Sequence, residues 1–384
     1  MSEEVKTIYL CLAHMSEEGY EQKYVKEAFD TNWVVPMGPN VYTFEQNLAD
    51  FSNANLDGSK LDRKVVCLSA GTAAVHLALI ACGVQLGDEV CVQSFTFCAS
   101  SHPITYLGAK PVFIDSEKET WNMDPELLEK AIIDRKEKTG KYPKAIIPVA
   151  LYGMPYDCER IMVIADKYGI PVIEDAAEGM GSRYNGQVLG TFGRFGVLSF
   201  NGNKMITTSG GGALICRSDE DANNIMWHAT QARDAYPYYQ HTEIGYNYRM
   251  SNVCAGIGRG QMTVLDAHIA HHKHVQELYE ELLADVPRIH LHKQPSEENE
   301  NGVKKYDSNF WLCAATLDED VKIQGQKNVY KEVIKTAVGG VSGVVKAVDS
   351  AVTDCQPNDN VEALRVFMAC LLYTSPSPRD STSS

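Results

Sequence analysis

Short apolar runs alternate with helical or turn-rich segments between about residues 64 and 216. Strands that are buried on both faces form continuous apolar runs, and their alternation with helices is typical of a layered α/β fold with a mostly parallel sheet. We predict seven strands, at KVVCLSA, DEVCVQSF, AKPVFID, KAIIPVAL, PVIED, GVLSF and GGALIC. Because ligands of such sheets bind at the carboxyl ends of the strands, the polar residues that end these runs are the first candidates for a site.

The pattern changes after the predicted sheet. Apolar residues recur at near-helical spacing over residues 262–285, which predicts one long helix that leads into a second, smaller domain. We therefore expect a large domain with an N-terminal arm over residues 1–255 and a small domain over residues 256–371. The glycine-rich GIGRG, at 256–260, follows helix-like sequence and predicts close packing rather than a ligand loop.

The C-terminal part departs from this regular pattern. Residues 321–355 have weak secondary-structure signals and are interpreted as an insertion. The run EALRVFMACLL is apolar and predicts a helix, whereas the polar, low-complexity residues 372–384 predict a disordered tail, with a non-native origin as an open alternative. We expect the small domain to be incomplete as a result.

Charge and composition exclude several classes of partner. The 384-residue chain has a formal net charge of −15, which argues against binding to nucleic acid or anionic membranes. The sequence contains no uninterrupted apolar run of roughly 18 residues, as a membrane span requires, and begins with no apolar leader. The eleven cysteines include no C-x-x-C pair, so neither a zinc site nor a disulfide framework is expected. A cytoplasmic location is the expectation.

The segment LSAGTAAVHLAL predicts a strand followed by a helix that opens at Gly71 and Thr72. Free backbone N–H groups and the helix dipole at such a start can bind a phosphate. An ordinary helix cap has a similar sequence, so this segment alone does not decide between the two. A G-x-G-x-x-G sequence does not follow the first strand, which disfavours a dinucleotide-binding fold.

Two other strand ends carry candidate groups. Glu174 and Asp175 end the run PVIED, where a carboxylate could pair with a protonated ring nitrogen or could form a salt bridge or helix cap. Phe95 and Phe97 end another run; they are either core residues or include one that stacks on a planar ring.

Lys204 lies in SFNGNK among Ser199, Asn201 and Asn203. A lone lysine is usually a surface residue. Here, however, the chain also offers a phosphate cradle, an acid and an aromatic ring at neighbouring strand ends. Pyridoxal phosphate requires this combination together with a lysine that forms an imine with its aldehyde.

A histidine-rich stretch, HIAHHKH, places His268, His271 and His272 at spacings that could meet on one helical face. A metal site there is conceivable, but no carboxylate or cysteine joins the pattern. We predict a solvated helix and no metal.

The motifs SAGTAA, SFTF, VIEDAAE, SFNGNK and GYNYRMSN resemble, in order and spacing, those of the DegT/DnrJ/StrS sugar aminotransferases. The resemblance covers about residues 8–312, and WVVPMGPNVYTFE is similar to the N-terminal substrate-side loop of the family. It implies a fold-type I pyridoxal phosphate enzyme that aminates nucleotide-linked keto-sugars.

The resemblance implies roles for individual residues. Lys204 would form the imine with the cofactor and move the proton between cofactor and substrate. Asp175 would pair with the pyridine nitrogen, Phe97 would stack on the ring, and Glu178 would lie beside it.

The phosphate would be held by Gly71, Thr72 and Ser199. Asn247 would reach the phosphate of the neighbouring subunit, so the resemblance implies a homodimer or a higher oligomer. Arg249 would lie nearby as a structural or substrate contact.

The implied reaction has two halves. Glutamate first gives its amine to the cofactor. The amine then passes to C4 of a 4-keto-6-deoxy sugar that is N-acetylated and linked to UDP. Family dehydratases replace the lysine with histidine, so Lys204 favours transamination. The alternatives are another fold-type I enzyme, such as a dehydratase, racemase or aldolase, or a non-catalytic pyridoxal phosphate-binding regulator, although the sequence has no DNA-binding domain or basic patch.

Overall fold

The computed structural model describes residues 13–318 and 365–368. Its centre is a sheet in the order β3-β2-β4-β5-β8-β9-β1, in which backbone bridges beside β4 and β5 join a three-stranded group to a four-stranded group. The strands are β1 (Lys64–Leu68), β2 (Glu89–Gln93), β3 (Lys110–Ile114), β4 (Ile146–Ile147), β5 (Ile173–Asp175), β8 (Phe195–Ser199) and β9 (Gly212–Cys216). Six run parallel to one another and β9 runs antiparallel to both of its neighbours. These are the seven predicted strands, so the mostly parallel α/β sheet is confirmed.

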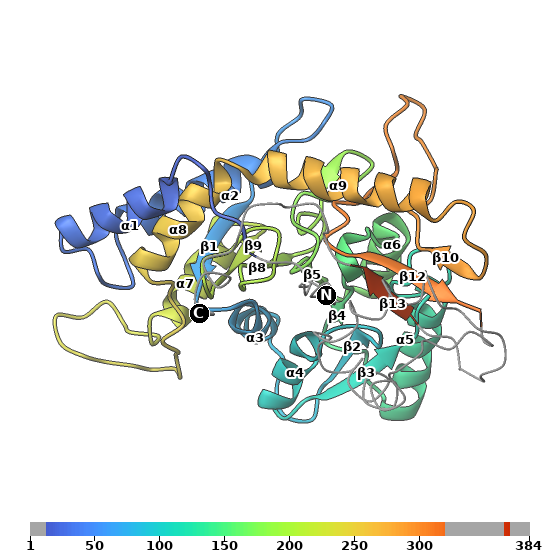
Figure 1. Ribbon diagram of the computed structural model, residues 1–384. Coiled ribbons are helices and arrows are strands. Elements are labelled where there is room, and N and C mark those ends of the chain that lie inside the picture. Colours follow the sequence, from blue (N-terminus) through green and yellow to red (C-terminus); the bar gives the residue numbers. More distant parts are fainter. Residues whose placement is uncertain (1–12, 319–364, 369–384) are drawn as a thin grey trace, which may run out of the picture.

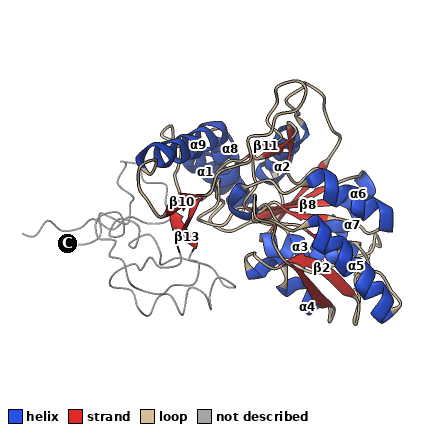
Figure 2. Cartoon of the chain, turned by 90° about the vertical axis from the view of Figure 1, so that its right-hand side faces the viewer, coloured by secondary structure: helices blue, strands red, loops and turns tan. Residues whose placement is uncertain are grey.

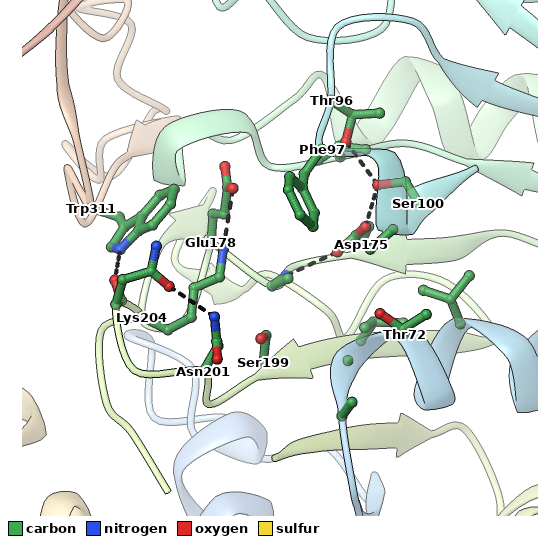
Figure 3. Close-up of a pocket in the computed structure, with 18 of the residues that line it drawn as sticks. Thr72, Thr96, Phe97, Ser100, Asp175, Glu178, Ser199, Asn201, Lys204 and Trp311 are labelled. Carbon is green, nitrogen blue, oxygen red and sulfur yellow. Dashed lines mark hydrogen bonds and ion pairs between the residues drawn. The ribbon is translucent and has the colours of Figure 1, made fainter. Parts of the chain in front are cut away.

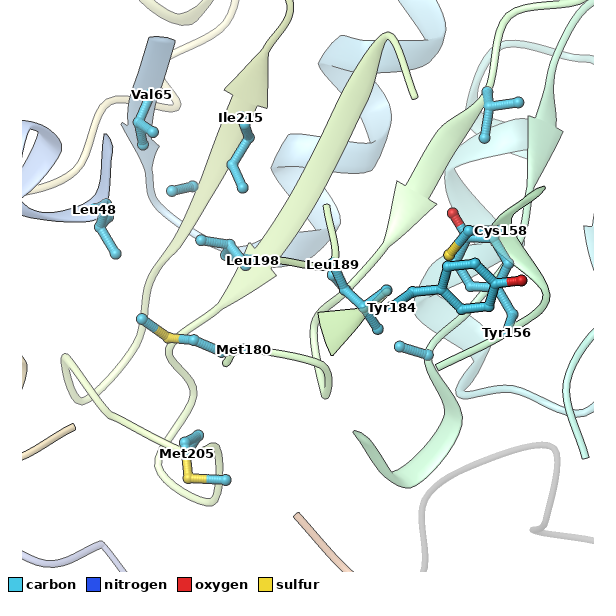
Figure 4. Close-up of a cluster of buried hydrophobic side chains, with 14 of the residues drawn as sticks. Leu48, Val65, Tyr156, Cys158, Met180, Tyr184, Leu189, Leu198, Met205 and Ile215 are labelled. Carbon is cyan, nitrogen blue, oxygen red and sulfur yellow. The ribbon is translucent and has the colours of Figure 1, made fainter. Parts of the chain in front are cut away.

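Helices cover both faces of this sheet (Figure 1). One face packs against α2 (Pro39–Asn53), α5 (Pro125–Thr139) and α6 (Cys158–Tyr168), and the other against α3 (Gly71–Ala81), α4 (His102–Tyr106) and α7 (Asp219–Ala229). Alternate residues of one strand therefore enter different cores: Val65 and Cys67 of β1 belong to the first, and Val66 and Leu68 to the second. Figure 4 shows part of the first core. Burial on both faces explains why the strands other than the edge strand β3 have continuous apolar sequences.

Three further helices are α1 (Tyr20–Asp30), α8 (Asn252–Met262) and α9 (Leu265–Leu282). Helix α8 packs against both α1 and α2. The glycines of α8 allow close approach, because a Cβ at Gly258 would lie 2.6 Å from the ring of Phe44 and one at Gly260 would lie 2.6 Å from the amide nitrogen of Glu21. The close-packing role predicted for GIGRG is confirmed. The long predicted helix is α9, and α8 ends separately at Met262.

Two small antiparallel sheets complete the described fold (Figure 2). One contains β6 (Arg183–Tyr184), β7 (Gln187–Val188) and β11 (Tyr306–Asp307), and the other contains β10 (Ile289–Leu291), β12 (Cys313–Leu317) and β13 (Arg365–Met368). Short 3₁₀ turns occur at Cys98–Ser100 and Leu151–Gly153.

Strand β13 corrects one prediction, because it lies inside the run that was predicted to be helical. It pairs with the edge of β12, and its sequence, RVFM, combines β-branched and aromatic residues that suit a strand when a partner edge is available. The predicted insertion at 321–355 and the predicted tail at 372–384 lie outside the described residues. Within residues 13–318 and 365–368, no helix has the length and apolar character required to cross a membrane.

Candidate active site

A cavity of about 380 Å³ opens at the carboxyl ends of the parallel strands. Its walls come from the segments that follow β1, β2, β5 and β8 and from the loop between β8 and β9 (Figure 3). The structure brings seven of the predicted site residues into its lining: Gly71, Thr72, Phe97, Asp175, Glu178, Ser199 and Lys204. Asn247 and Arg249 do not line it.

The start of α3 forms one end of the cavity. The residue before the helix is Ala70, whose side chain has no acceptor for the first N–H groups, so these remain available for an anion. Gly212 of β9 lies directly against this turn, because a Cβ there would be 2.4 Å from the amide nitrogen of Gly71. Ser199 is adjacent, with its Cβ 3.2 Å from the Cβ position at Gly71. This geometry suits a phosphate and argues against the ordinary-cap interpretation.

Asp175 ends β5 and is only 6% exposed. Its carboxylate accepts hydrogen bonds from the Ser100 hydroxyl at 2.6 Å and from the Ala177 amide at 3.2 Å, and Ser100 in turn is 2.7 Å from the hydroxyl of Thr96. Burial raises the pKa of Asp175, and the bonds from Ser100 and Ala177 oppose this rise. A cationic ring nitrogen in the cavity would give the buried carboxylate a charged partner.

The preceding residue, Glu174, has a different surrounding. Successive side chains of a strand point to opposite faces, so Glu174 points away from the cavity. Its carboxylate accepts the backbone N–H groups of Gly190, Phe192 and Gly193 at 2.9, 2.6 and 2.7 Å. Glu174 therefore anchors a loop, and only the second of the two adjacent acids serves the cavity.

Lys204 lies in the loop between β8 and β9, and its side chain is 13% exposed. Its Nζ is 3.2 Å from a carboxylate oxygen of Glu178, whose other oxygen accepts the Tyr152 amide at 2.8 Å. The ring of Trp311 lies over the amine, with Nζ 4.0 Å from the ring centroid. The Trp311 indole donates to the backbone carbonyl of Asn203 at 2.7 Å, so the same residue contacts both the amine and its loop.

Phe97 is half-exposed and lines the cavity, and Figure 3 shows its ring projecting into the cavity on the side of Asp175. An aromatic ring left uncovered beside a buried acid is suited to stacking on a planar heterocycle. Together with the start of α3, Asp175 and Lys204, it gives the cavity each of the groups that pyridoxal phosphate requires. The residues present therefore fit this cofactor.

Arg249 has structural contacts outside the cavity. Its buried guanidinium pairs with Glu45 of α2 and donates to the Cys67 carbonyl at 2.8 Å. It therefore fixes α2 and the end of β1, which is the structural one of its two predicted roles.

The histidine-rich stretch also differs from its prediction. His268 and His272 of α9 are buried rather than solvated. In the part of the chain that the structure describes, no group of three or more His, Cys, Asp or Glu side chains could hold a metal ion.

Sequence reasoning missed four residues that line or support the cavity: Thr96, Ser100, Tyr152 and Trp311. The hydroxyls of Thr96 and Ser100 belong to the segment SFTFCAS, beside Phe95 and Phe97, so the local sequence contains a signal for them. Trp311 has no local signal, because it reaches Lys204 from a distant part of the chain.

Comparisons with known proteins agree with this geometry. Residues 15–341 match the DegT/DnrJ/EryC1/StrS aminotransferase family. The chain is 45% identical over 313 residues to EpsN of Bacillus subtilis (strain 168), named as a pyridoxal phosphate-dependent aminotransferase, covering 82% of this chain and 76% of EpsN. It is 36% identical to the GDP-perosamine synthase of Escherichia coli O157:H7, covering 73% of each chain. It is 37% identical to the UDP-2-acetamido-2-deoxy-3-oxo-D-glucuronate aminotransferase of Pseudomonas aeruginosa PAO1, covering 65% of each.

Among solved structures, the PLP form of Spr1654 from Streptococcus pneumoniae, described as a sugar aminotransferase, superposes with a TM-score of 0.74. The superposition covers 98% of this chain and 96% of that one at 22% identity, a likeness that concerns the fold alone. From the family match and these relatives, the chain belongs to the DegT/DnrJ/EryC1/StrS aminotransferase family and is a pyridoxal phosphate-dependent aminotransferase.

Proposed function

We propose that this enzyme transfers the amino group of glutamate to a keto-sugar carried on a nucleotide. The observation that carries the proposal is the meeting of Lys204, Asp175 and the uncapped start of α3 in one cavity. Support for the substrate class comes from relatives whose names specify GDP- and UDP-linked sugars. For this chain we propose a UDP-linked, N-acetylated 4-keto-6-deoxy sugar with amination at C4.

The cavity residues have distinct proposed roles. The N–H groups at Gly71, with the hydroxyls of Thr72 and Ser199, bind the cofactor phosphate, and Phe97 and Asp175 orient the ring. When bound, pyridoxal phosphate supplies an electron sink for the substrate carbon. Lys204 Nζ carries the proton to and from that carbon, and Glu178 holds Nζ in place through the 3.2 Å contact.

Asn247 supports a homodimer in this proposal. It is exposed, its backbone forms a bridge with Thr230, and it does not line the cavity of its own chain. A residue with this placement is free to enter the site of a second copy, where its amide can donate to the phosphate.

The free thiols of the described cysteines agree with the proposed cytoplasmic location.

The proposal is tested by single turnover. The pyridoxamine form of the enzyme is mixed with UDP- and GDP-linked sugars that carry the ketone at C3 or at C4, and the return of the aldehyde form is followed by its visible absorbance. We expect the fastest return with the UDP-linked N-acetylated 4-keto sugar. A faster return with a 3-keto sugar would reassign the position, and no return with any keto-sugar would contradict the substrate class. Formation of 2-oxoglutarate from glutamate tests the donor separately.

A further inference from the structure

Two buried histidines of α9 form hydrogen bonds with backbone carbonyls next to Lys204 and next to Trp311 in the sequence. His268 Nδ1 lies 3.3 Å from the carbonyl oxygen of Met205, the residue after Lys204. His272 Nδ1 lies 3.2 Å from the carbonyl oxygen of Phe310, the residue before Trp311. His268 therefore bonds to the residue that follows Lys204, which bears the amine. His272 bonds to the residue that precedes Trp311, whose ring lies over the amine.

The bonding partners define the protonation state of these rings. A backbone carbonyl only accepts, so Nδ1 of each histidine must carry the proton. Burial lowers the pKa of both rings, that of His272 to about 4, so each is neutral near pH 7. The bond to the Phe310 carbonyl opposes the fall in the pKa of His272, whereas His271, His268 and His14 lower it further. The bond to the Met205 carbonyl and the charge of Glu21 oppose the fall in the pKa of His268. The neutral Nδ1–H form is thus the one that holds the two carbonyls.

The segment around Phe310 needs such a support. Phe310 has a φ of 47°, in the left-handed region that an aromatic residue rarely adopts. Its amide is bonded to the Ser308 hydroxyl, and the next amide, of Trp311, is bonded to the Asn309 side chain at 2.8 Å. His272 supplies the bond to the Phe310 carbonyl. The unusual backbone is therefore held at three consecutive points, and the Trp311 ring is directed over Lys204 as a result.

We propose that His268 and His272 are positioning residues for Lys204. His268 fixes the loop that bears the amine, and His272 fixes the backbone that presents Trp311 to it. The proposal rests on the proposed role of Lys204 in binding the cofactor. Neither histidine lines the cavity, so their effect passes through the backbone and not through contact with cofactor or substrate.

The test replaces each histidine by Asn and, separately, by Gln. The Asn amide nitrogen occupies nearly the position of histidine Nδ1, whereas the Gln amide nitrogen extends to the position of Nε2. Both replacements are polar, so their effects on folding are comparable, and only Asn can restore the bond to the carbonyl. His274→Gln is the matched control, because His274 lies on the same helix with its side chain 60% exposed.

The measurement is the rate at which the apoprotein gains visible absorbance after pyridoxal phosphate is added, followed by kcat and KM for glutamate. We expect the Asn variants to react within about twofold of the parent and the Gln variants to react about three- to tenfold more slowly, the effect of losing one hydrogen bond. KM for glutamate should stay unchanged while kcat falls. If each histidine only stabilised the fold, the Asn and Gln variants would gain absorbance at the same rate once the rates are corrected for the folded fraction.

The outcomes separate this inference from the proposed function. If the parent gains the absorbance, Lys204→Ala does not, and the Gln variants react as fast as His274→Gln, the positioning role is wrong while the role of Lys204 stands. If Lys204→Ala gains the same absorbance as the parent, the role of Lys204 itself is wrong. An Asn variant as slow as its Gln counterpart would also overturn the inference, because the restored bond would then have no effect.

Discussion

The adjacent acids Glu174 and Asp175 offer a contrast between a structural carboxylate and one that we propose to pair with the cofactor ring. The perturbation is the matched pair Glu174→Gln and Asp175→Asn, in which each carboxylate becomes the amide of the same size. At Asp175 the donors are the Ser100 hydroxyl and the Ala177 amide. An asparagine has one acceptor oxygen, so one donor must find another partner, and Ser100 can turn to Thr96.

The expected magnitudes follow from these contacts. Because Ser100 has an alternative acceptor, Asp175→Asn should cost about 1 kcal/mol of unfolding free energy, the low end for a disturbed buried hydrogen bond. It removes the charge opposite the ring nitrogen, so kcat/KM should fall about 100-fold or more, equivalent to about 2.7 kcal/mol. At Glu174, three backbone N–H groups face the carboxylate, and a glutamine nitrogen can accept none of them. Glu174→Gln should therefore cost about 3 kcal/mol of stability.

Two assays distinguish the residues. Urea unfolding of the apoproteins gives the stability change, and kcat/KM at saturating cofactor, corrected for the folded fraction, gives the catalytic change. Glu174→Gln should retain activity within about threefold, since it changes no cavity contact. A loss below about threefold for Asp175→Asn would mean that Asp175 is only structural. Equal catalytic losses in the two variants would refute the assignment of one acid to each face of the strand.

Four further predictions concern other contacts. Lys204→Ala should lose the yellow absorbance, roughly 400 to 430 nm, and all transamination, and a fully active variant would contradict the mechanism. In a dimer that combines an Asn247→Ala chain with a Lys204→Ala chain, about one site should work if Asn247 serves its neighbour; activity no higher than that of the parents would contradict this. Arg249→Met should lower the unfolding free energy, measured in urea, by about 3 to 5 kcal/mol, because it leaves the Glu45 carboxylate without its cation. A double variant that also carries Glu45→Gln should recover part of the loss. A loss below about 1 kcal/mol in the single variant would contradict the importance of the pair. His272 takes up a proton near pH 6.5 when unfolded but near pH 4 when folded, so stability should fall as the pH falls between these values, by up to about 3 kcal/mol, and urea unfolding of His272→Asn should show a shallower dependence.

The sequence predicted the strands and the site correctly where the residue pattern within a segment reflects how that segment packs in the fold. Six of the seven strands are largely buried on both faces, and the edge strand β3 is partly exposed; all lie in mostly apolar runs of sequence. The groups that follow the parallel strands meet at one edge because these strands share a direction. For this reason, the sequence alone predicted that the segments around Gly71, Asp175 and Lys204 meet at one edge of the sheet. Glu174 and Asp175 could also have been separated, since the strand period of two places them on opposite faces.

Other features depended on partners that no local pattern encodes. The RVFM segment suits a helix or a strand by apolar content, and the available edge of β12 decided between them. The polar character of HIAHHKH predicted solvent exposure, but carbonyls of Met205 and Phe310 satisfy two of its rings in the interior. Trp311 contacts Lys204 and the Asn203 carbonyl from more than 100 residues away in the sequence, and no local pattern encodes such a contact.

The contact between Gly212 and the start of α3 has a consequence for the order of folding. The turn that we propose to bind the cofactor phosphate is complete only when β9 has paired with β1, because Gly212 packs on Gly71 through that pairing. Strands β1 and β9 are the first and last strands of the central sheet along the chain. Such long-range closure comes late, since its entropic cost precedes its contacts. A chain emerging from the ribosome thus cannot form this turn before β9 has left the exit tunnel. In refolding experiments, cofactor absorbance should return after the helical circular dichroism, which makes the cofactor a reporter of sheet completion rather than a template for it.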